Sequence, residues 1–445
     1  MAQPRFGTDG IRGRAPEDLT AAIAHSVGRA SAQVLQSRTA VLGRDTRASG
    51  PVLSEAVAAG LVECGVDVID VGVLPTPGVA FLSASLNCPG FVISASHNPY
   101  FDNGIKVIGV GGTKLSVDQE QAIEALLDEP AVSAAPTPGS FSARPELSAL
   151  YINHVVGAVA QDALRGLTIV LDCANGASST TAAEIFRRLG GEIIVLADAP
   201  NGTNINDGVG STHPEMLAAA VIEHQADFGL AFDGDADRLV SVDETGTIVP
   251  GDALLALFAA DLKKRELLAN NAIVVTVMTN LGFHRAMETA GIMVETVAVG
   301  DRNVVEAIDQ GGHVLGGEQS GHIIFRSLAT TGDGVLTGVL LAELVQRQRR
   351  PLSVLSREAM TLVPQYLEAV RIAPGRTIDE NPVLREHLSA LEEQLGRRGR
   401  ILVRASGTEP VIRVMVEADT DGEARQITQE LVSLVQSTMG SQEEQ

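Results

Sequence analysis

The chain has 445 residues, of which 45% are hydrophobic and 20% are charged, and its formal net charge is −22. This length predicts three or four domains of roughly 100 to 150 residues, and the acidic balance excludes nonspecific nucleic-acid binding, which needs a basic surface. No apolar run reaches the roughly 20 residues of a membrane span, so we expect a soluble protein without a membrane partner.

A glycine-rich segment lies near the N-terminus. Phe6-Gly7-Thr8-Asp9-Gly10-Ile11-Arg12-Gly13 has three glycines in eight residues. Glycine lets the backbone approach a ligand closely, so we predict a loop that brings Arg12 to a binding site. A surface ion pair is the commoner role of a single arginine, and the segment alone does not decide between the two.

The first 330 residues are predicted to repeat one order of elements three times. The order is a strand, a loop, an amphipathic helix closed by glycine, a second strand, and a third strand that ends in a polar loop. In the first copy the strand Thr39–Leu42 enters the loop Gly43–Arg47, a helix ends at Cys64–Gly65, and the strands Val66–Val71 and Phe91–Ile93 follow. The last strand leads into Ser94-Ala95-Ser96-His97-Asn98-Pro99.

Ser96 has two enzymatic interpretations: a nucleophile activated by a base, or a carrier of phosphate. Adjacent side chains on an extended backbone point to opposite faces, so His97 is poorly placed as the base of a triad for Ser96. A phosphoserine needs only a metal and cationic neighbours. Its phosphate would carry about −1.5 to −2 charges and offer an oxygen ligand to a nearby cation. A turn stopped by Pro99 is the alternative without a function.

In the second copy the strand Thr168–Leu171 enters Asp172-Cys173-Ala174-Asn175-Gly176, a helix ends at Leu189–Gly190, and the strands Ile193–Leu196 and Phe228–Phe232 follow. The last strand leads into Asp233-Gly234-Asp235-Ala236-Asp237-Arg238. Carboxylates at i, i+2 and i+4 can converge on one hard cation, for which Mg²⁺ is the expected occupant. An acidic surface turn is disfavoured, because three carboxylates directly after an apolar strand repel one another without a cation.

An EF-hand calcium loop is another interpretation of this segment. The three aspartates fit its positions 1, 3 and 5, and Glu244 falls at position 12. Position 6, where the sharp turn needs glycine, is Arg238, and the preceding residues have the pattern of a strand and not of a helix. We therefore favour a magnesium site over an EF-hand.

In the third copy the strand Ala272–Val277, a helix that ends at Ala290–Gly291, and the strands Met293–Val297 and His313–Leu315 lead into Gly316-Gly317-Glu318-Gln319-Ser320-Gly321-His322. Glu318 and Ser320 suit sugar hydroxyls, because a carboxylate accepts two vicinal hydroxyl protons and the flanking glycines permit close approach. A glycine-rich turn is the alternative. His322 can act as a general acid or base, although a lone histidine is more often structural.

A strand-helix-strand-strand-helix pattern predicts a smaller α+β domain at the C-terminus. Its short strand Ile401–Val403 leads into Arg404-Ala405-Ser406-Gly407-Thr408-Glu409-Pro410, which offers a guanidinium, two hydroxyls and an exposed backbone to a remote phosphate. Arg413 lies on the next strand, and its contribution depends on the face that it occupies. Gly109–Lys114 is rejected as a P-loop, because no Gly-Lys-Ser/Thr follows at the required spacing.

Alternating strands and helices predict an α/β protein with parallel, doubly wound sheets, whose ligand crevices lie at the carboxyl ends of the strands. All three polar loops are predicted at such ends. The Pro/Ala/Ser-rich stretch Pro130–Arg144 and the segment Arg349–Pro364 separate units. The predicted domains are residues 1–150, 151–254, 255–364 and 365–445.

The three cysteines, Cys64, Cys88 and Cys173, have no CxxC spacing, and residues 1–6 lack the apolar stretch of a secretory signal. These features predict a reducing, cytoplasmic location and neither a disulfide framework nor a zinc site.

Five segments, in chain order FGTDGIRG, ISASHNP, DGDADR, GGEQSGH and RASGTEP, resemble the motifs of the α-D-phosphohexomutases. The resemblance covers the full chain, and within the family it is strongest to the bacterial enzymes that act on glucosamine phosphate. It implies three similar α/β domains and a smaller C-terminal domain around a central cleft. These domains would carry, in order, a phosphoserine loop, a metal loop, a sugar loop and a phosphate-binding loop.

The resemblance also implies roles for individual residues. Ser96 would be the phosphoserine, and with Asp233, Asp235 and Asp237 it would bind one Mg²⁺. Glu318 and Ser320 would hold sugar hydroxyls, and the nonreacting phosphate would be held by Arg404, Ser406, Gly407 and Thr408. The cationic groups around the reacting phosphate would be Arg12, Lys106, Arg238 and His322. His97 joins the candidates because it is next to Ser96, and the general base is left open.

The activity implied by the resemblance is that of a phosphohexomutase, an isomerase. Phosphorylated Ser96 would give its phosphate to glucosamine 6-phosphate, and the 1,6-bisphosphate would reorient and return the other phosphate, leaving glucosamine 1-phosphate for UDP-N-acetylglucosamine and cell-wall synthesis. A hexose 1,6-bisphosphate is expected as the activator. Phosphoryl transfer needs in-line positioning and charge neutralisation, which a cation and several basic groups provide.

Three alternatives stay open. Within the family, a phosphomannomutase/phosphoglucomutase is the nearest one, because only Gln319 in the sugar loop favours glucosamine. A phosphoserine-dependent sugar-phosphate hydrolase would pass the phosphate to water instead. A noncatalytic sensor is disfavoured, since sensing needs neither Ser96 nor three aspartates. Sugar phosphates are the expected partners, and whether the chain forms a homodimer is left open.

Overall fold

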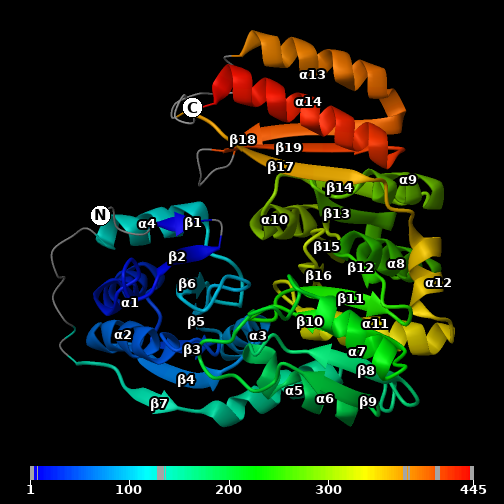
Figure 1. Ribbon diagram of the computed structural model, residues 1–445. Helices are drawn as coiled ribbons and strands as arrows, with labels where there is room; N and C mark the ends of the chain where they lie inside the picture. The colour runs from blue at the N-terminus through cyan, green and yellow to red at the C-terminus, as the bar shows by residue number, and fades with distance from the viewer. Residues whose placement is uncertain are drawn as a thin grey trace. The chain divides into compact units, whose positions relative to one another are not determined.

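The structure is a computed structural model, and it describes residues 5–7, 9–127, 135, 137–373, 378, 381–405 and 411–440. The chain divides into a larger unit, residues 1–278 with 291–359, and a smaller unit, residues 279–290 with 360–445. Figure 1 colours the larger unit from blue to yellow and most of the smaller unit from orange to red. Among the described residues no helix combines the length and the apolar character needed to cross a membrane.

The first sheet of the larger unit has seven strands. They are β1 (Phe6–Gly7), β2 (Gly10–Arg14), β3 (Thr39–Arg44), β4 (Asp67–Val73), β5 (Gly90–Ile93), β6 (Asp102–Ile108) and β7 (Phe141–Ala143), in the order β1-β2-β6-β5-β3-β4-β7. β5, β3, β4 and β7 are parallel neighbours, whereas β6, β2 and β1 pair antiparallel. Among its helices, α1 (Ala21–Leu35) packs on α2 (Gly50–Glu63) and α4 (Val117–Leu127), whereas α3 (Thr76–Leu86) packs on β3 and β5.

The second sheet has five strands, β8 (Thr168–Asp172), β9 (Glu192–Leu196), β10 (Phe228–Phe232), β11 (Leu239–Asp243) and β12 (Ile248–Val249), in the order β12-β11-β10-β8-β9. β10, β8 and β9 run parallel, and β11 returns antiparallel beside β10. The helices of this part are α5 (Ser148–Val156), α6 (Ala182–Arg188) and α7 (Glu215–Glu223), whereas α8 (Gly251–Lys264), which follows them, packs on the third sheet.

The third sheet has four strands, β13 (Ala272–Thr276), β14 (Met293–Val297), β15 (Leu315–Gly317) and β16 (Ile323–Phe325), in the order β14-β13-β15-β16. β14, β13 and β15 run parallel, and β16 is antiparallel to β15. Helices α10 (Asp301–Gly311), α11 (Gly334–Gln348) and α12 (Leu352–Ala359) complete the larger unit.

The three sheets share one topology, as the threefold sequence pattern predicts. Each contains the same four-strand order, β6-β5-β3-β4, β11-β10-β8-β9 and β16-β15-β13-β14. The expectation of wholly parallel sheets was wrong for the fourth strand of each set, because a short loop can return the chain only beside the strand that it has just left, which makes the pair antiparallel. The three polar loops, residues 94–101, 233–238 and 318–322, are these return connections.

Continuous apolar runs form the inner strands. β10 and β13 are buried at every position. Such runs are typical of strands that are covered on both faces, where no polar alternation is needed. The polar loops therefore begin at the ends of rigid, buried strands.

The smaller unit is built on a three-stranded antiparallel sheet. Its elements are β17 (Gln365–Arg371), α13 (Pro382–Leu395), β18 (Gly399–Ala405), β19 (Val411–Ala418) and α14 (Asp421–Met439), which follow the predicted order, and the strands lie in the order β17-β19-β18. Helix α9 (Leu281–Ala290) belongs to this unit. The backbone N–H of Leu281 donates to the Glu417 side chain at 3.0 Å, which ties α9 to the C-terminal sheet.

A buried carboxyl group precedes α11. Asp333 accepts hydrogen bonds from the backbone N–H of Leu336 at 2.9 Å and from the Tyr151 hydroxyl at 3.0 Å. Burial raises the pKa of Asp333 to about 6, although these donors act in the opposite direction. Because the folded-state pKa lies above the ordinary value of 3.8, this group favours folding most at pH values below its ordinary pKa. The favourable contribution is lost as the pH rises through about 6.

We expect Asp333→Asn to remove the loss of stability at rising pH, because the asparagine amide keeps an acceptor for the backbone N–H of Leu336 and has no charge to bury. The melting temperature of the variant should rise relative to the wild type between about pH 5 and about pH 8. The folded-state pKa of about 6 lies about one unit above the lower pH, so the wild type should lose roughly 1.4 kcal/mol of stability over this window. Scanning calorimetry at both pH values measures the difference. Asp118→Asn, at an exposed position of α4, is the control. A difference that is the same at both pH values would contradict the prediction.

Candidate active site

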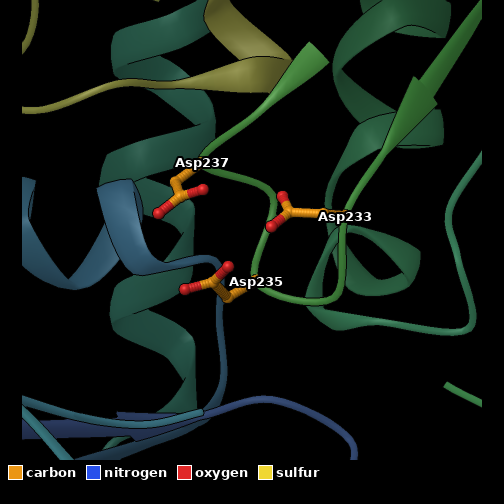
Figure 2. Close-up of side chains that lie close together, drawn as sticks. All are labelled: Asp233, Asp235 and Asp237. Carbon is orange, nitrogen blue, oxygen red and sulfur yellow. The ribbon is translucent and has the colours of Figure 1, made fainter. Parts of the chain in front are cut away.

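The acidic loop between β10 and β11 is the centre of the candidate site. Asp233, Asp235 and Asp237 are buried, and one oxygen from each carboxylate lies within 4.8 Å of one from each of the others. Figure 2 shows the three carboxylates on one curled loop, turned toward a shared space. Ala236 has a φ of 57°, a left-handed conformation that lets the loop curl. Glu244 accepts a hydrogen bond from the Ser353 backbone N–H at 3.2 Å and is not part of this group.

Two oxygens of this group have the environment of metal ligands. Oδ1 of Asp235 and Oδ1 of Asp237 are buried and have no hydrogen-bond partner. A buried, unpaired carboxylate oxygen costs free energy unless a cation or a donor meets it. Burial and the charges of Asp237 and Asp235 also raise the pKa of Asp233. The arrangement fits a divalent cation with oxygen ligands, such as Mg²⁺, which would offset this repulsion.

Ser96 meets the acidic loop from a position 137 residues earlier in the chain. Its hydroxyl donates to Oδ2 of Asp233 at 2.5 Å, and the residue is buried. The φ of Ser96 is 53°, a left-handed conformation that is uncommon for serine. A Cβ at Gly234 would lie 2.5 Å from the Ser96 carbonyl oxygen, so glycine is needed for the two loops to approach this closely.

His97 lies closer to the serine hydroxyl than an extended backbone predicts. Its Nδ1 is 3.4 Å from Oγ of Ser96, because the left-handed conformation of Ser96 turns the two neighbouring side chains toward each other. The expectation that they point to opposite faces was therefore wrong. Burial and the positive charges of Arg238 and Arg12 lower the pKa of His97 to about 4. The ring is therefore neutral near physiological pH.

Lys106, on β6, provides a buried positive charge. Its Nζ lies 2.7 Å from an oxygen of Asp235, 2.9 Å from one of Asp9 and 3.2 Å from one of Asp237. Burial by itself lowers the pKa of Lys106, but the three carboxylates outweigh it and raise the pKa well above its ordinary value. The charged ammonium group joins the N-terminal segment to the acidic loop.

Arg12 lies on strand β2, and not on a loop as predicted. Gly7 and Gly10 pair with each other in a tight hairpin between β1 and β2, and β2 then pairs along β6. The guanidinium contacts Asp9 at 2.5 Å and the Asn98 side chain at 3.5 Å. Arg12 thus lies beside the serine loop, held by a strand.

Arg238 and Thr76 complete the surroundings of the carboxylates. Arg238 donates its backbone N–H to Asp233 at 3.2 Å, and its Nε lies 3.9 Å from Asp237. The Thr76 hydroxyl donates to Oδ2 of Asp235 at 2.6 Å, and its backbone N–H donates to the Asp235 carbonyl at 2.9 Å. Thr76 therefore occupies Oδ2 of Asp235, and Oδ1 is the oxygen of this carboxylate that has no hydrogen-bond partner.

The third polar loop joins β15 to β16 and contains Glu318 and Ser320. The Ser320 hydroxyl is 3.5 Å from Oε2 of Glu318, and the backbone N–H of Gly300 donates to Oε1 of Glu318 at 3.1 Å. A hydroxyl and a carboxylate lie side by side in this loop. That combination can accept from and donate to neighbouring sugar hydroxyls.

His322 closes the same loop and is buried. Its Nδ1 lies 3.7 Å from Asp237 and its Nε2 lies 3.8 Å from Asp301. Burial lowers the pKa of His322, but Asp237 and Asp301 raise it to about 9. The backbone N–H of Gly332 donates to Nε2 at 3.1 Å, which instead requires a neutral ring. The hydrogen bond from Gly332 favours the neutral ring, and a divalent cation at Asp237 would favour it further, because the cation would cancel much of the field that raises this pKa.

Arg404 is the described part of the predicted phosphate loop. It lies on β18 in the smaller unit, directly opposite Arg413 of β19. Burial and the charge of Arg413 lower the pKa of Arg404. Like charges on paired positions disfavour the sheet, and an anion would offset that cost. Ser406, Gly407 and Thr408 lie outside the described residues.

Several neighbours of the site have no role assigned by the sequence analysis, namely Asp9, Arg47, Thr76, Lys114, Asn206 and Asp301. Lys114, for example, lies 3.5 Å from Asp9 and 2.5 Å from Asp301. A local signal for Arg47 does exist, because the loop Gly43–Arg47 follows the first strand at its carboxyl end. Asp9 likewise lies in the glycine-rich segment that was predicted to reach a binding site, whereas the others have no such local signal.

Family profiles match four consecutive parts of the chain. Those described as Phosphoglucomutase/phosphomannomutase, alpha/beta/alpha domains I, II and III, match residues 3–132, 149–246 and 250–363, and the C-terminal domain matches residues 367–434. The chain belongs to the phosphoglucomutase/phosphomannomutase family. This phosphohexomutase is 47% identical over 442 residues to the phosphoglucosamine mutase of Rhodococcus jostii (strain RHA1), covering 97% of this chain and 99% of that protein. It is 48% identical over 440 residues to that of Desulforudis audaxviator (strain MP104C), covering 97% of each.

Solved structures have the same fold as this phosphohexomutase. A phosphoglucomutase/phosphomannomutase family protein from Burkholderia thailandensis superposes with a TM-score of 0.82 at 28% identity, covering 97% of both chains. The N-acetylphosphoglucosamine mutase of Aspergillus fumigatus, in complex with GlcNAc-6P and magnesium, gives a TM-score of 0.72 at 18% identity over 98% of this chain and 96% of that one, which shows the fold alone. The predicted family, fold class and enzyme class are confirmed.

Proposed function

We propose that this phosphohexomutase interconverts glucosamine 6-phosphate and glucosamine 1-phosphate, with Ser96 as the carrier of phosphate. The observation that supports it most directly is the 2.5 Å contact between Oγ of Ser96 and Asp233, within a buried group of three carboxylates. Relatives named phosphoglucosamine mutase, 47% and 48% identical over nearly the whole chain, support the choice of substrate.

In the proposed reaction the C1 hydroxyl of glucosamine 6-phosphate attacks the phosphorus on Ser96. The new O–P bond forms as the bond to Oγ breaks, and the hydroxyl proton passes to Oγ of Ser96. The resulting 1,6-bisphosphate turns end for end, Oγ attacks the 6-phosphoryl group as the bond between its phosphorus and the C6 oxygen breaks, and the proton of Oγ passes to that sugar oxygen. The serine ends each cycle phosphorylated, so atoms and charge balance. A hexose 1,6-bisphosphate is the proposed source of the first phosphate.

The residues around Ser96 suit such a transfer. We assign Asp233, Asp235 and Asp237, with the phosphorylated Ser96, as the holders of one Mg²⁺, which when bound supplies positive charge to the phosphoryl oxygens. Lys106 is charged and buried beside two of these carboxylates. Arg12, Arg238 and His322 are the proposed cationic or hydrogen-bonding groups toward the transferring phosphate, and His97, neutral at physiological pH, lies within 3.4 Å of Oγ.

Recognition of the rest of the substrate is assigned to two further loops. Glu318 and Ser320, whose polar atoms are 3.5 Å apart, are proposed to bind the sugar hydroxyls. Arg404 is proposed to bind the nonreacting phosphate with Ser406, Gly407 and Thr408, and its like-charged partner Arg413 supports this role. We further propose that the enzyme works in the cytoplasm.

An isomerase assay tests the proposed substrate. Purified protein with Mg²⁺ and a trace of hexose 1,6-bisphosphate is compared on glucosamine 6-phosphate, glucose 6-phosphate and mannose 6-phosphate. We expect kcat/KM to favour glucosamine 6-phosphate by about 10-fold or more, which corresponds to about 1.4 kcal/mol in transition-state binding.

Other outcomes would point to the alternatives. A preference for glucose or mannose phosphate would keep the mechanism and overturn the substrate. Steady release of inorganic phosphate without isomerisation would favour a hydrolase that passes the phosphate of Ser96 to water. Binding of sugar phosphates without any turnover would favour a sensor.

A further inference from the structure

A fully buried arginine lies beneath the serine loop. Arg47, between β3 and α2, has no exposed side-chain surface. A guanidinium has five N–H bonds, and here every one has an acceptor. Nε donates to Asp45 at 2.9 Å. Nη1 and Nη2 donate to three backbone carbonyls of the serine loop (residues 94–101), Ser96 at 2.8 Å, Asn98 at 2.9 Å and Pro99, and to that of Asp102 at the start of β6 at 3.0 Å.

A second donor reaches the same loop from the second sheet. Nδ2 of Asn206, in the connection between β9 and α7, donates to the carbonyl of Ser96 at 2.9 Å and to that of Asn98 at 3.1 Å. Asn206 is itself held, because its backbone N–H donates to the Ala174 carbonyl at 3.0 Å. The carbonyl oxygen of Ser96 therefore accepts from two side chains that belong to two different sheets.

These contacts act on the backbone of Ser96, not on its hydroxyl. With φ at 53°, Ser96 holds a left-handed conformation that is unfavourable for serine, and such a conformation persists only where its surroundings impose it. Two donors on one carbonyl fix the plane of the peptide that follows Ser96. The direction of the Cα–Cβ bond, and with it the position of Oγ beside Asp233, depends on that plane.

We infer that Arg47 and Asn206 are positioning residues for phosphoryl transfer, which hold the Ser96 backbone so that Oγ stays in line for the reaction. Asn206 and the acidic loop both follow strands of the second sheet. The position of Oγ of Ser96 therefore depends on how the second sheet packs against the first. This inference rests on the proposed role of Ser96 as the phosphate carrier.

Asn206→Ala and Arg47→Lys test the inference. Alanine removes one pair of donors, whereas lysine keeps the charge but has three donors and no planar fork. We expect kcat to fall about 10- to 100-fold in each, as for a displacement of about 1 Å, while KM for the sugar phosphate stays within about 3-fold, because the sugar loop is not touched. Because the two side chains share their acceptors, the losses in the double variant should not multiply. Phosphate uptake by Ser96 from glucose 1,6-bisphosphate, followed by intact mass, should slow to the same degree.

Thr203→Ala is the matched control. Thr203 is exposed on the same connection as Asn206, and its hydroxyl donates to the side chain of Asn201, so kcat and KM should match the wild type. An unchanged kcat in Asn206→Ala would overturn the inference. A loss of activity seen only at temperatures close to a lowered melting temperature of the variant would also overturn it, because that loss would come from unfolding. If Arg47→Lys does not fold, Asn206→Ala still decides. Wild-type protein that takes up no phosphate from the bisphosphate would refute the proposed function itself, which separates the two failures.

Discussion

Replacement of Ser96 by alanine is expected to lower kcat at least about 10⁴-fold, because the variant has no oxygen to carry the phosphate. The fold should persist, since the change removes only the contacts of the hydroxyl with Asp233 and His97 and leaves the loop contacts of Arg47 and Asn206 in place. Turnover of glucosamine 6-phosphate with a trace of bisphosphate measures the first effect. The melting temperature, followed by circular dichroism, measures the second.

Ser85→Ala serves as the control for Ser96→Ala. Ser85 is exposed on α3, and its hydroxyl donates to the Phe81 carbonyl at 2.8 Å, away from the carboxylate cluster. Wild-type protein and Ser85→Ala should each gain the mass of one phosphoryl group after incubation with glucose 1,6-bisphosphate, and Ser96→Ala should gain none. Normal turnover or phosphate uptake in Ser96→Ala would end the proposed role of this serine.

Replacement of Asp235 by asparagine is expected to reduce turnover at least about 100-fold, as removal of one charge-stabilising group from a preorganised site does. It should also abolish the stabilisation of the protein by Mg²⁺. Oδ1 of Asp235 is the buried oxygen without a partner, while Oδ2 is occupied by Thr76 and Lys106. The amide has nearly the same volume, so the expected change is the loss of a cation ligand rather than a cavity.

Thermal unfolding with and without Mg²⁺ gives a readout that is independent of activity. A ligand that binds only the native state stabilises it by about 2.7 kcal/mol at 100 times its Kd, so the melting temperature of the wild type should rise by several degrees and return on chelation. Asp118→Asn, which changes the net charge equally at an exposed position, should behave like the wild type. The proposed metal site would be refuted if Asp235→Asn gained as much from Mg²⁺ as Asp118→Asn.

The inner strands and the positions of the polar loops were predictable because their signals are local. Phe228–Phe232 is a continuous apolar run, and the acidic loop follows it directly, so both the buried strand and the place of the loop can be read without knowledge of the rest of the chain. The direction of β6, β11 and β16 was not predictable in this way. Strand direction depends on which neighbour completes the backbone hydrogen bonds, and the residues of the strand do not specify that neighbour.

The residues of the candidate site also differ in whether a local sequence signal reveals them. Asp233, Asp235 and Asp237 lie on one short loop at alternate positions, and this spacing, visible in the sequence, predicts that they converge. Lys106 could be assigned only through resemblance to a family, since its contacts come from Asp9 and from the acidic loop far along the chain.

The threefold α/β pattern, the three polar loops, the acidic triad and, through five motifs, the family could be inferred from the amino-acid sequence. The contact of Ser96 with Asp233, the turn of His97 toward the serine hydroxyl, and the shared hydrogen bonds of Arg47 and Asn206 to the Ser96 carbonyl became apparent only in the folded structure. These contacts arise because a buried polar group needs a hydrogen-bond partner, and tertiary packing determines which groups are close enough to be that partner. Those partners here lie on loops brought together by separate sheets, which no local propensity encodes.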